Sequence, residues 1–360
     1  MGLLQSNYRP VVTECETFVD CFYKLLSNAS RLDIAVGYIT ADSLVELQEI
    51  VECNNLSQLN LIIGMHYLDK FTQIQYKAAC RLNDYLRNRQ KGEVRLVKPF
   101  KYHGKLYLYS NENGAFASIV GSNNLGSIVK DNNRIYETSY LIDSKEDTSK
   151  VQSFISKLSA SSTANIADCE ISEFRENNDV LGNLENVEKI SHHEHALCLN
   201  SFTSTRFEIP IKDYDVAPRS SLNAFFGKGR ETPNGLIQPR HWYESEIIVP
   251  KEIATSPGYP VSKTEESQFI VITDDGWKFS CKISGQNNKN FRSNGDLKIL
   301  GKWLKGRLEN AGVLEVGNPV TKETLDCYGR TSFSFIKTTI PNTWYLDFES
   351  KNENILKSLS

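Results

Sequence analysis

A short part of the chain, residues 103–137, carries side chains that could bind and attack a phosphodiester. His103 and Lys105 are separated by one residue, so on an extended strand both side chains point to the same face. Asn124 ends the sequence Gly-Ser-Asn-Asn, and Glu137 lies in the next strand-like segment. An imidazole can act as nucleophile or acid, an ammonium group and an amide can neutralise phosphate oxygens, and a carboxylate can orient the imidazole. Together these residue types predict phosphoryl chemistry.

The segments that must position these residues alternate between strand-like and helix-like patterns. Strands are expected at 32–39, 59–65, 92–98, 104–110, 116–122 and 135–143, and helices at 41–52 and 71–89. Residues 111–114, Asn-Glu-Asn-Gly, are typical of a hairpin turn. This alternation predicts an α/β domain over residues 1–143, in which helices flank a mixed sheet.

The character of the chain changes after residue 143. Between 144 and 190, nine acidic residues outnumber five basic ones, which predicts an acidic linker over 144–194 that contains a short helix at 149–159. Short strands broken by Gly, Pro and Asn follow at 196–202, 206–211, 245–250, 268–273, 277–284 and 332–340, with a helix at 296–312. That spacing predicts a second, mainly β domain over 195–360, a small barrel or sandwich.

Two segments of this second domain are locally basic, although the whole chain has a net charge of −3. Residues 219–240 have a net charge of +3 and residues 278–307 a net charge of +7. Both segments also supply amides, and amide and guanidinium groups can read base edges. The candidate DNA-contacting residues are Arg219, Asn223, Lys228, Arg230, Arg240, Trp242, Gln286, Asn287, Asn288, Lys289, Arg292, Asn294 and Asp296.

The sequences His-Gly-Lys at 103–105 and Gly-Ser-Asn-Asn at 121–124, followed by Glu137, resemble the catalytic motif of the phospholipase D superfamily. The resemblance implies that His103 forms a phosphohistidine and that Lys105 and Asn124 bind phosphate oxygens. It also implies that Ser122 is a weaker member of this shell and that Glu137 orients the histidine. Many members have an aspartate where this chain has Ser110, so no role is carried over for that position.

The superfamily mechanism uses two such motifs, one histidine attacking while the other protonates the leaving oxygen. None of the other five histidines in this chain is part of a His-x-Lys sequence. The resemblance therefore implies a homodimer with one composite active site across its two-fold axis. It also implies that the reaction needs no metal or other cofactor.

The second half resembles the B3-like DNA-binding domain, a pseudobarrel, of NgoFVII-type restriction endonucleases, with BfiI a more distant relative. The resembling segments begin near residue 221 and include 241–250, 276–305 and 332–339. This resemblance implies a type II-like enzyme that cleaves double-stranded DNA at a specific sequence and works beside a companion DNA methyltransferase. Some relatives also work with a helicase-like ATPase, so the resemblance allows such a partner here.

Three other functions remain open at this stage. The chain could be a non-catalytic sequence-specific DNA-binding protein, a lipid or nonspecific phosphodiesterase, or a metal-dependent nuclease that uses Asp296 in the Asp-Leu-Lys sequence at 296–298. The eight scattered cysteines, without paired spacing, favour reduced thiols and a cytoplasmic location. No apolar run is long enough to cross a bilayer, so a membrane partner is not expected.

Overall fold

The chain forms two compact units. A computed structural model describes residues 2–129, 135–175, 180–182, 184–262, 264 and 267–352. Unit 1 contains residues 2–129, 135–175 and 229–239, and unit 2 contains the other described residues. No described helix combines the length and the hydrophobicity that a membrane span requires.

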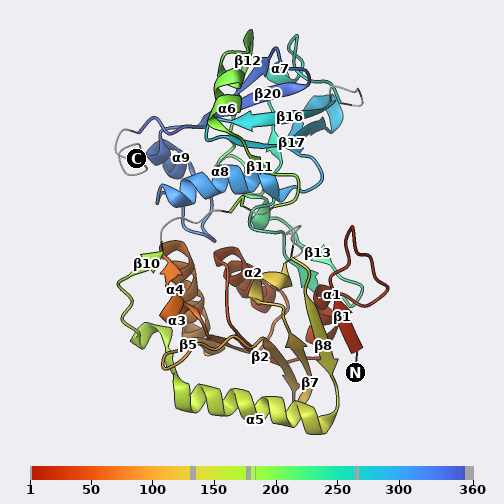
Figure 1. Cartoon of the computed structure of the whole chain (residues 1–360), viewed down its shortest axis with the longest axis vertical. Coiled ribbons are helices and arrows are strands. Elements are labelled where there is room, and N and C mark those ends of the chain that lie inside the picture. Colours follow the sequence, from red (N-terminus) through yellow and green to blue (C-terminus); the bar gives the residue numbers. More distant parts are fainter. Residues whose placement is uncertain are drawn as a thin grey trace. The chain divides into compact units, whose positions relative to one another are not determined.

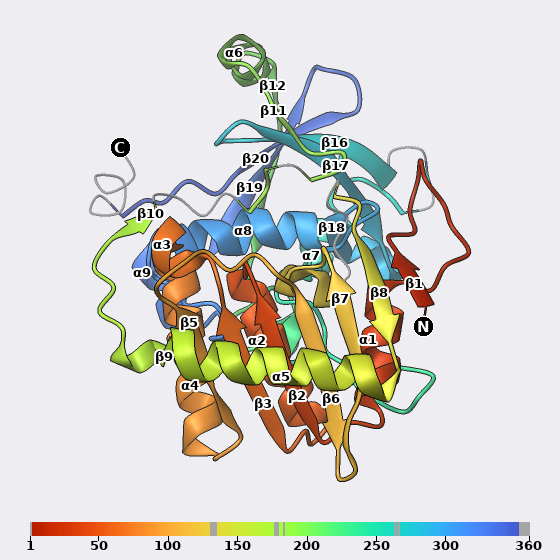
Figure 2. The ribbon, with the colours of Figure 1, turned by 60° about the horizontal axis from the view of Figure 1, so that its bottom comes forward.

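Unit 1 (Figure 1) is built on a mixed eight-stranded sheet with the strand order β1-β8-β7-β6-β2-β3-β5-β9, whose strands are labelled in Figure 2. Strands β2, β3 and β5 are mutually parallel, and the remaining neighbours pair antiparallel. The strands of the sheet are β1 Gly2–Gln5, β2 Arg31–Val36, β3 Gln58–Ile63, β5 Gly92–Val97, β6 Leu106–Asn111, β7 Gly114–Gly121, β8 Thr138–Ile142 and β9 Thr163–Asn165. Two short pairs are separate from it: β4 Phe71–Thr72 with β10 Phe174–Arg175, and β13 Arg230–Glu231 with β14 Ile237–Gln238.

Helices cover both faces of this sheet, as the α/β pattern predicted. Helix α5 lies along one face, and α2 and α4 lie on the other (Figures 1 and 2). Ile155 and Leu158 of α5 pack against Ala35, Ile62 and Leu108 of the sheet. The helices of unit 1 are α1 Phe18–Leu26, α2 Ala41–Cys53, α3 His66–Asp69, α4 Gln73–Asn88, α5 Lys145–Ser162 and the 3-10 turns η1 Leu125–Ile128 and η2 Ile166–Asp168.

Unit 2 is mainly β, and an aromatic core fills it. Its sheet has the strand order β12-β19-β20-β16-β17-β18-β15, with β11 paired to β17. Phe335 stacks on Trp344 at 3.9 Å between ring centroids, and Phe269 and Phe291 pack around them. The elements are β11 Glu188–Lys189, α6 His192–Leu199, β12 Phe202–Pro210, η3 Ala224–Phe226, β15 Ile247–Ile248, α7 Lys251–Ala254, β16 Gln268–Thr273, β17 Trp277–Ser284, η5 Gln286–Asn288, β18 Asn290–Ser293, α8 Lys298–Asn310, α9 Lys322–Tyr328, β19 Ser332–Thr338 and β20 Thr343–Asp347.

Two segments differ from the sequence-based prediction. Residues 144–175, expected to begin an acidic linker, form α5, β9, η2 and β10 of unit 1. Only one stripe of α5 is apolar, and that stripe is enough to cover the sheet. Residues 196–202, expected as a strand, belong mostly to α6, whose N-terminus is capped by the Ser191 hydroxyl accepting the Glu194 N–H at 3.2 Å.

Candidate functional site

The five predicted catalytic residues lie at one edge of the unit 1 sheet. His103 and Lys105 come just before β6, Ser122 and Asn124 just after β7, and Glu137 just before β8. Because β7 is antiparallel to both of its neighbours, its end lies beside the starts of β6 and β8. The structure therefore brings residues from three segments of the sequence to one place.

The lysine of the motif is buried, whereas the histidine is exposed. Lys105 is 7% exposed, and its Nζ donates a hydrogen bond to the carbonyl oxygen of His103 at 2.8 Å. Burial lowers the pKa of Lys105, and the negative charge of Glu137 acts in the opposite direction. The Lys105 ammonium group is therefore held at the backbone of an exposed histidine, and a partly desolvated ammonium group is suited to bind an anionic phosphate oxygen.

The orientation of Asn124 is fixed by the chain after β2. Its Oδ1 accepts the Tyr38 backbone N–H at 3.0 Å. A backbone N–H can only donate, so the side-chain oxygen must face Tyr38, and the Nδ2 amide group is left as the donor for a phosphate. The preceding Gly37 allows the close approach of His103, because a Cβ at this position would lie 2.8 Å from His103 Cδ2 and the histidine ring would have to move.

Ser122 holds the end of β7 against the start of β8. Its hydroxyl accepts the Thr138 N–H at 2.9 Å and donates to the Thr138 carbonyl at 3.1 Å. Next to it, Gly121 has no room for a side chain, since a Cβ would lie 2.2 Å from Ser139 Oγ. The structure thus gives Ser122 a fold-stabilising contact, while its predicted contact with phosphate stays a prediction.

Glu137 is held through its backbone by the N-terminal strand. Its N–H donates to Ser6 Oγ at 2.9 Å, and its carbonyl accepts the Ser6 N–H at 3.0 Å. Within the described residues, its carboxylate makes no hydrogen bond to the His103 imidazole. The orienting role predicted for Glu137 therefore stays a prediction, and the ring that packs on His103 is that of Tyr38, at 5.5 Å between centroids.

A second histidine, His66, lies at the same edge but is a structural residue. It is 1% exposed, stacks on Phe71 at 4.7 Å between centroids, and accepts the Ile39 N–H through Nε2 at 3.2 Å. Burial lowers the pKa of His66 to about 4. It is therefore neutral near pH 7 and supports the backbone next to Tyr38.

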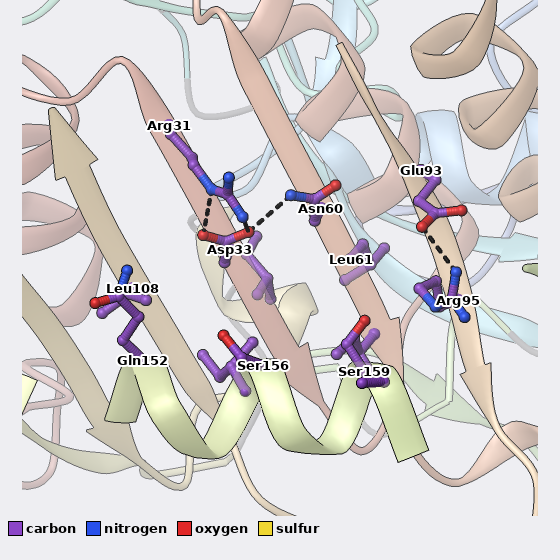
Figure 3. A pocket seen from close by; sticks show the side chains of 14 residues that line it. Arg31, Asp33, Asn60, Leu61, Glu93, Arg95, Leu108, Gln152, Ser156 and Ser159 are labelled. Carbon is purple, nitrogen blue, oxygen red and sulfur yellow. Dashed lines mark hydrogen bonds and ion pairs between the residues drawn. The ribbon is translucent and has the colours of Figure 1, made fainter. Parts of the chain in front are cut away.

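A polar pocket of about 410 Å³ lies at the other end of β2, under α5 (Figure 3). Arg31 pairs with Asp33 through two contacts of 2.7 and 2.9 Å, and Asn60 donates to the same carboxylate at 2.8 Å. Glu93 and Arg95 form a second pair at 2.8 Å. These charges neutralise each other, so the pocket has no excess positive charge to attract a phosphate.

The first predicted DNA-reading segment, 219–240, is divided between the units. Arg219 and Lys228 are exposed in unit 2. Residues 229–239, which include the exposed Arg230, belong to unit 1. There the Asn54 side chain accepts the Ile237 N–H at 2.8 Å and donates to the Ile237 carbonyl at 3.0 Å. Arg240 pairs with Glu244 at 2.7 Å.

Two predicted contacts in this segment need correction. Asn223 and Trp242 are fully buried. Asn223 bonds the backbone of Val320, and Trp242 packs against Phe225 and donates to Glu309. Their side chains maintain the fold of unit 2, because neither is open to a groove of DNA.

The second segment keeps more of its predicted surface. Gln286, Asn287 and Lys289 are exposed on the turn between β17 and β18. The other four predicted residues have partners: Asn288 accepts the Ser262 N–H at 2.9 Å, Arg292 pairs with Glu246 at 3.3 Å, Asn294 donates to Gln268 at 3.3 Å, and Asp296 accepts the Lys298 N–H at 2.9 Å. The exposed amides and lysine of this turn are the best placed to contact DNA.

Much of the positive charge counted in residues 278–307 is not on the surface. Lys298, Lys302 and Lys305 of α8 are 7%, 6% and 0% exposed, and Arg307 pairs with Asp274.

Among the described residues, no group of three or more His, Cys, Asp or Glu side chains is arranged to hold a metal.

Comparison with known families finds a match for each half of the sequence. Residues 16–175 match the NgoFVII restriction endonuclease N-terminal PLD domain, and residues 197–339 match the NgoFVII C-terminal B3-like DNA-binding domain. No curated protein matches the chain. Because the two matches account for both halves of the sequence, in the same order as the two domains expected from it, the chain belongs to the NgoFVII family of restriction endonucleases.

Proposed function

We propose that this restriction endonuclease hydrolyses DNA phosphodiesters through a covalent phosphohistidine on His103. The observation that carries the proposal is the convergence of His103, Lys105, Asn124 and Glu137 at one edge of the unit 1 sheet. In the first step, a ring nitrogen of His103 attacks phosphorus and the bond from phosphorus to the 3′-oxygen breaks. In the second step, water attacks the phosphohistidine and releases the 5′-phosphate. Lys105 and Asn124 stabilise the negative oxygens in both transition states.

The proposed active site needs two copies of the chain. The leaving 3′-oxygen must receive a proton, and this chain has only one His-x-Lys sequence. His103 of the partner subunit supplies that proton and later activates the water. The enzyme is then a homodimer with one composite site that cuts the two strands in turn, and all chemistry is acid-base and covalent, without a metal.

The proposal extends to recognition and partners. Arg219, Lys228, Gln286, Asn287 and Lys289 are the exposed candidates for reading a specific sequence in duplex DNA. The enzyme works in the cytoplasm as the type II-like nuclease of a restriction-modification pair with a DNA methyltransferase, and a helicase-like ATPase is a partner to test by adding ATP and that subunit.

Plasmid cleavage in excess EDTA tests the central step. Wild-type protein should cut at fixed positions without metal, His103→Ala should be inactive, and the exposed His193→Ala should cut normally as the matched control. Cleavage that needs magnesium and survives His103→Ala would contradict the proposal and favour a metal-dependent nuclease. No cleavage under any condition, with DNA still bound, would favour a non-catalytic binder.

Mixing subunits tests the composite site. When wild-type and His103→Ala chains are allowed to exchange, activity should fall as the square of the wild-type fraction, because only dimers with two wild-type histidines are active. A fall in direct proportion to that fraction would show that each subunit works alone.

A further inference from the structure

Tyr38 contacts two of the residues that the proposed reaction uses. Its backbone N–H donates to Asn124 Oδ1 at 3.0 Å. Its ring meets the His103 imidazole at 5.5 Å between centroids, with the ring planes 77° apart. These contacts join segments that are 65 and 86 residues away in the sequence, and no sequence motif marks the tyrosine.

Tyr38 is itself held on two sides. Its hydroxyl donates to Asp69 Oδ2 at 2.8 Å, and the other oxygen of Asp69 pairs with Lys101 at 2.5 Å. The His66 ring packs edge-on against the Tyr38 ring at 5.4 Å between centroids. The pKa of Asp69 is lowered by its bonds to Lys101 and Tyr38, and the pKa of Tyr38 is raised by the bond to Asp69. The phenol therefore stays a neutral donor to a carboxylate around neutral pH.

We infer that Tyr38 is a positioning residue, which holds the His103 ring and the Asn124 amide in the relative geometry needed for attack on phosphorus. The inference rests on the proposed function and deepens it. The ring limits rotation of the imidazole, the backbone N–H sets which end of the amide faces the phosphate, and the bond to Asp69 keeps the ring in place. Errors of about 1 Å in such geometry can lower a rate by about 100-fold.

Three variants test this role. Tyr38→Ala removes the ring but keeps the backbone bond to Asn124, and Tyr38→Phe removes only the bond to Asp69. Tyr67→Ala is the matched control, because Tyr67 is in the same short helix as Asp69 and its ring faces Lys98. For each protein, the single-turnover cleavage rate at saturating DNA, the DNA dissociation constant and the melting temperature are measured on the full chain in EDTA.

The expected result is a split between rate and binding. Tyr38→Ala should lose about 100-fold in single-turnover rate at an unchanged dissociation constant and melting temperature, and Tyr38→Phe should recover most of that loss. Tyr67→Ala should behave as wild type.

If the wild-type enzyme is active, two results from the variants would overturn this inference and leave the proposed function intact. One is an unchanged cleavage rate in Tyr38→Ala. The other is a parallel loss of rate, DNA binding and melting temperature that Tyr38→Phe does not restore, which would indicate a merely structural residue. A wild-type protein that does not cleave in EDTA, or that cleaves as well after His103→Ala, would instead overturn the proposed function and the inference with it.

Discussion

Lys305, the most deeply buried lysine of α8, should contribute to the stability of unit 2 and not to DNA affinity. Lys305 is 0% exposed, its Nζ donates to the Trp242 carbonyl at 2.7 Å, and it lies 3.6 Å from the centroid of the Trp242 ring. Glu309, one turn later, accepts from Trp242 Nε1 at 2.7 Å and from the Tyr243 hydroxyl at 2.8 Å. Burial lowers the pKa of Lys305, and the negative charge of Glu309 opposes that shift.

Lys305→Met takes the ammonium group away from a buried carboxylate and removes the donor to a buried carbonyl. A buried polar group that loses its hydrogen-bond partner costs about 1–3 kcal/mol, so the free energy of unfolding should fall by about that amount. Glu309→Gln should also destabilise. The double variant should cost about 2 kcal/mol less than the sum of the two single variants, because neither charge is then left without the other.

Urea unfolding followed by tryptophan fluorescence measures these changes in unit 2, because all four tryptophans of the chain lie there. The dependence of DNA affinity on salt should be the same for Lys305→Met and wild type, whereas Lys289→Ala should lower the slope of log K against log salt by about 1. A Lys305→Met protein of wild-type stability with a reduced salt slope would refute the reasoning and make Lys305 a DNA-contacting residue.

Three further predictions concern unit 1. Gly37→Ala should lower the cleavage rate by about 100-fold without changing DNA affinity, because the new methyl group displaces His103, and a normal rate would contradict the close approach. Ser122→Ala should lower the cleavage rate less than about tenfold. Asn124→Ala should lower it about 100-fold or more, because it removes a hydrogen-bond donor to the transition state. Equal losses in the two variants would make Ser122 a phosphate ligand. The pKa of His66 is lowered from the ordinary histidine value of 6.5 to about 4 in the folded protein. Between pH 6.5 and about pH 4, the histidine therefore takes up a proton in the unfolded chain but not in the folded one. The free energy of unfolding should fall by up to about 3 kcal/mol as the pH falls through this range. His66→Gln should remove this part of the pH dependence, as measured by urea unfolding followed by circular dichroism.

Much of the secondary structure of both units was predictable because its signals are local. The helix expected at 41–52 is α2, Ala41–Cys53, and the strands expected at 268–273 and 277–284 in the second half are β16 and β17. Helix α5 was underestimated because its composition is polar, and its role depends on a sheet face that distant strands build. Helix α6 did have a local signal, because Ser191 stands three residues before Glu194, as in a helix N-terminal cap. The strand-like pattern of the residues after Glu194 led to the prediction of a strand instead.

The site could be predicted only in part. The structure brings the five predicted residues together, while their catalytic roles stay predictions. Tyr38 was not predicted, because its contacts arise from a backbone N–H and from a ring placed by folding. Charge counting also failed for α8, since a sequence does not show that Lys305 faces a tryptophan and a glutamate in the interior. Asn223 and Trp242 were misplaced for the same reason: burial depends on tertiary packing, which residue type alone does not determine.

The stereochemical course at phosphorus tests the central claim most directly. A substrate with a chiral phosphorothioate at the scissile position is cleaved in isotopically labelled water, and the configuration of the 5′-thiophosphate product is determined. Each displacement inverts phosphorus, so attack by His103 followed by attack of water predicts overall retention. Inversion would show a single displacement by water and would contradict the phosphohistidine.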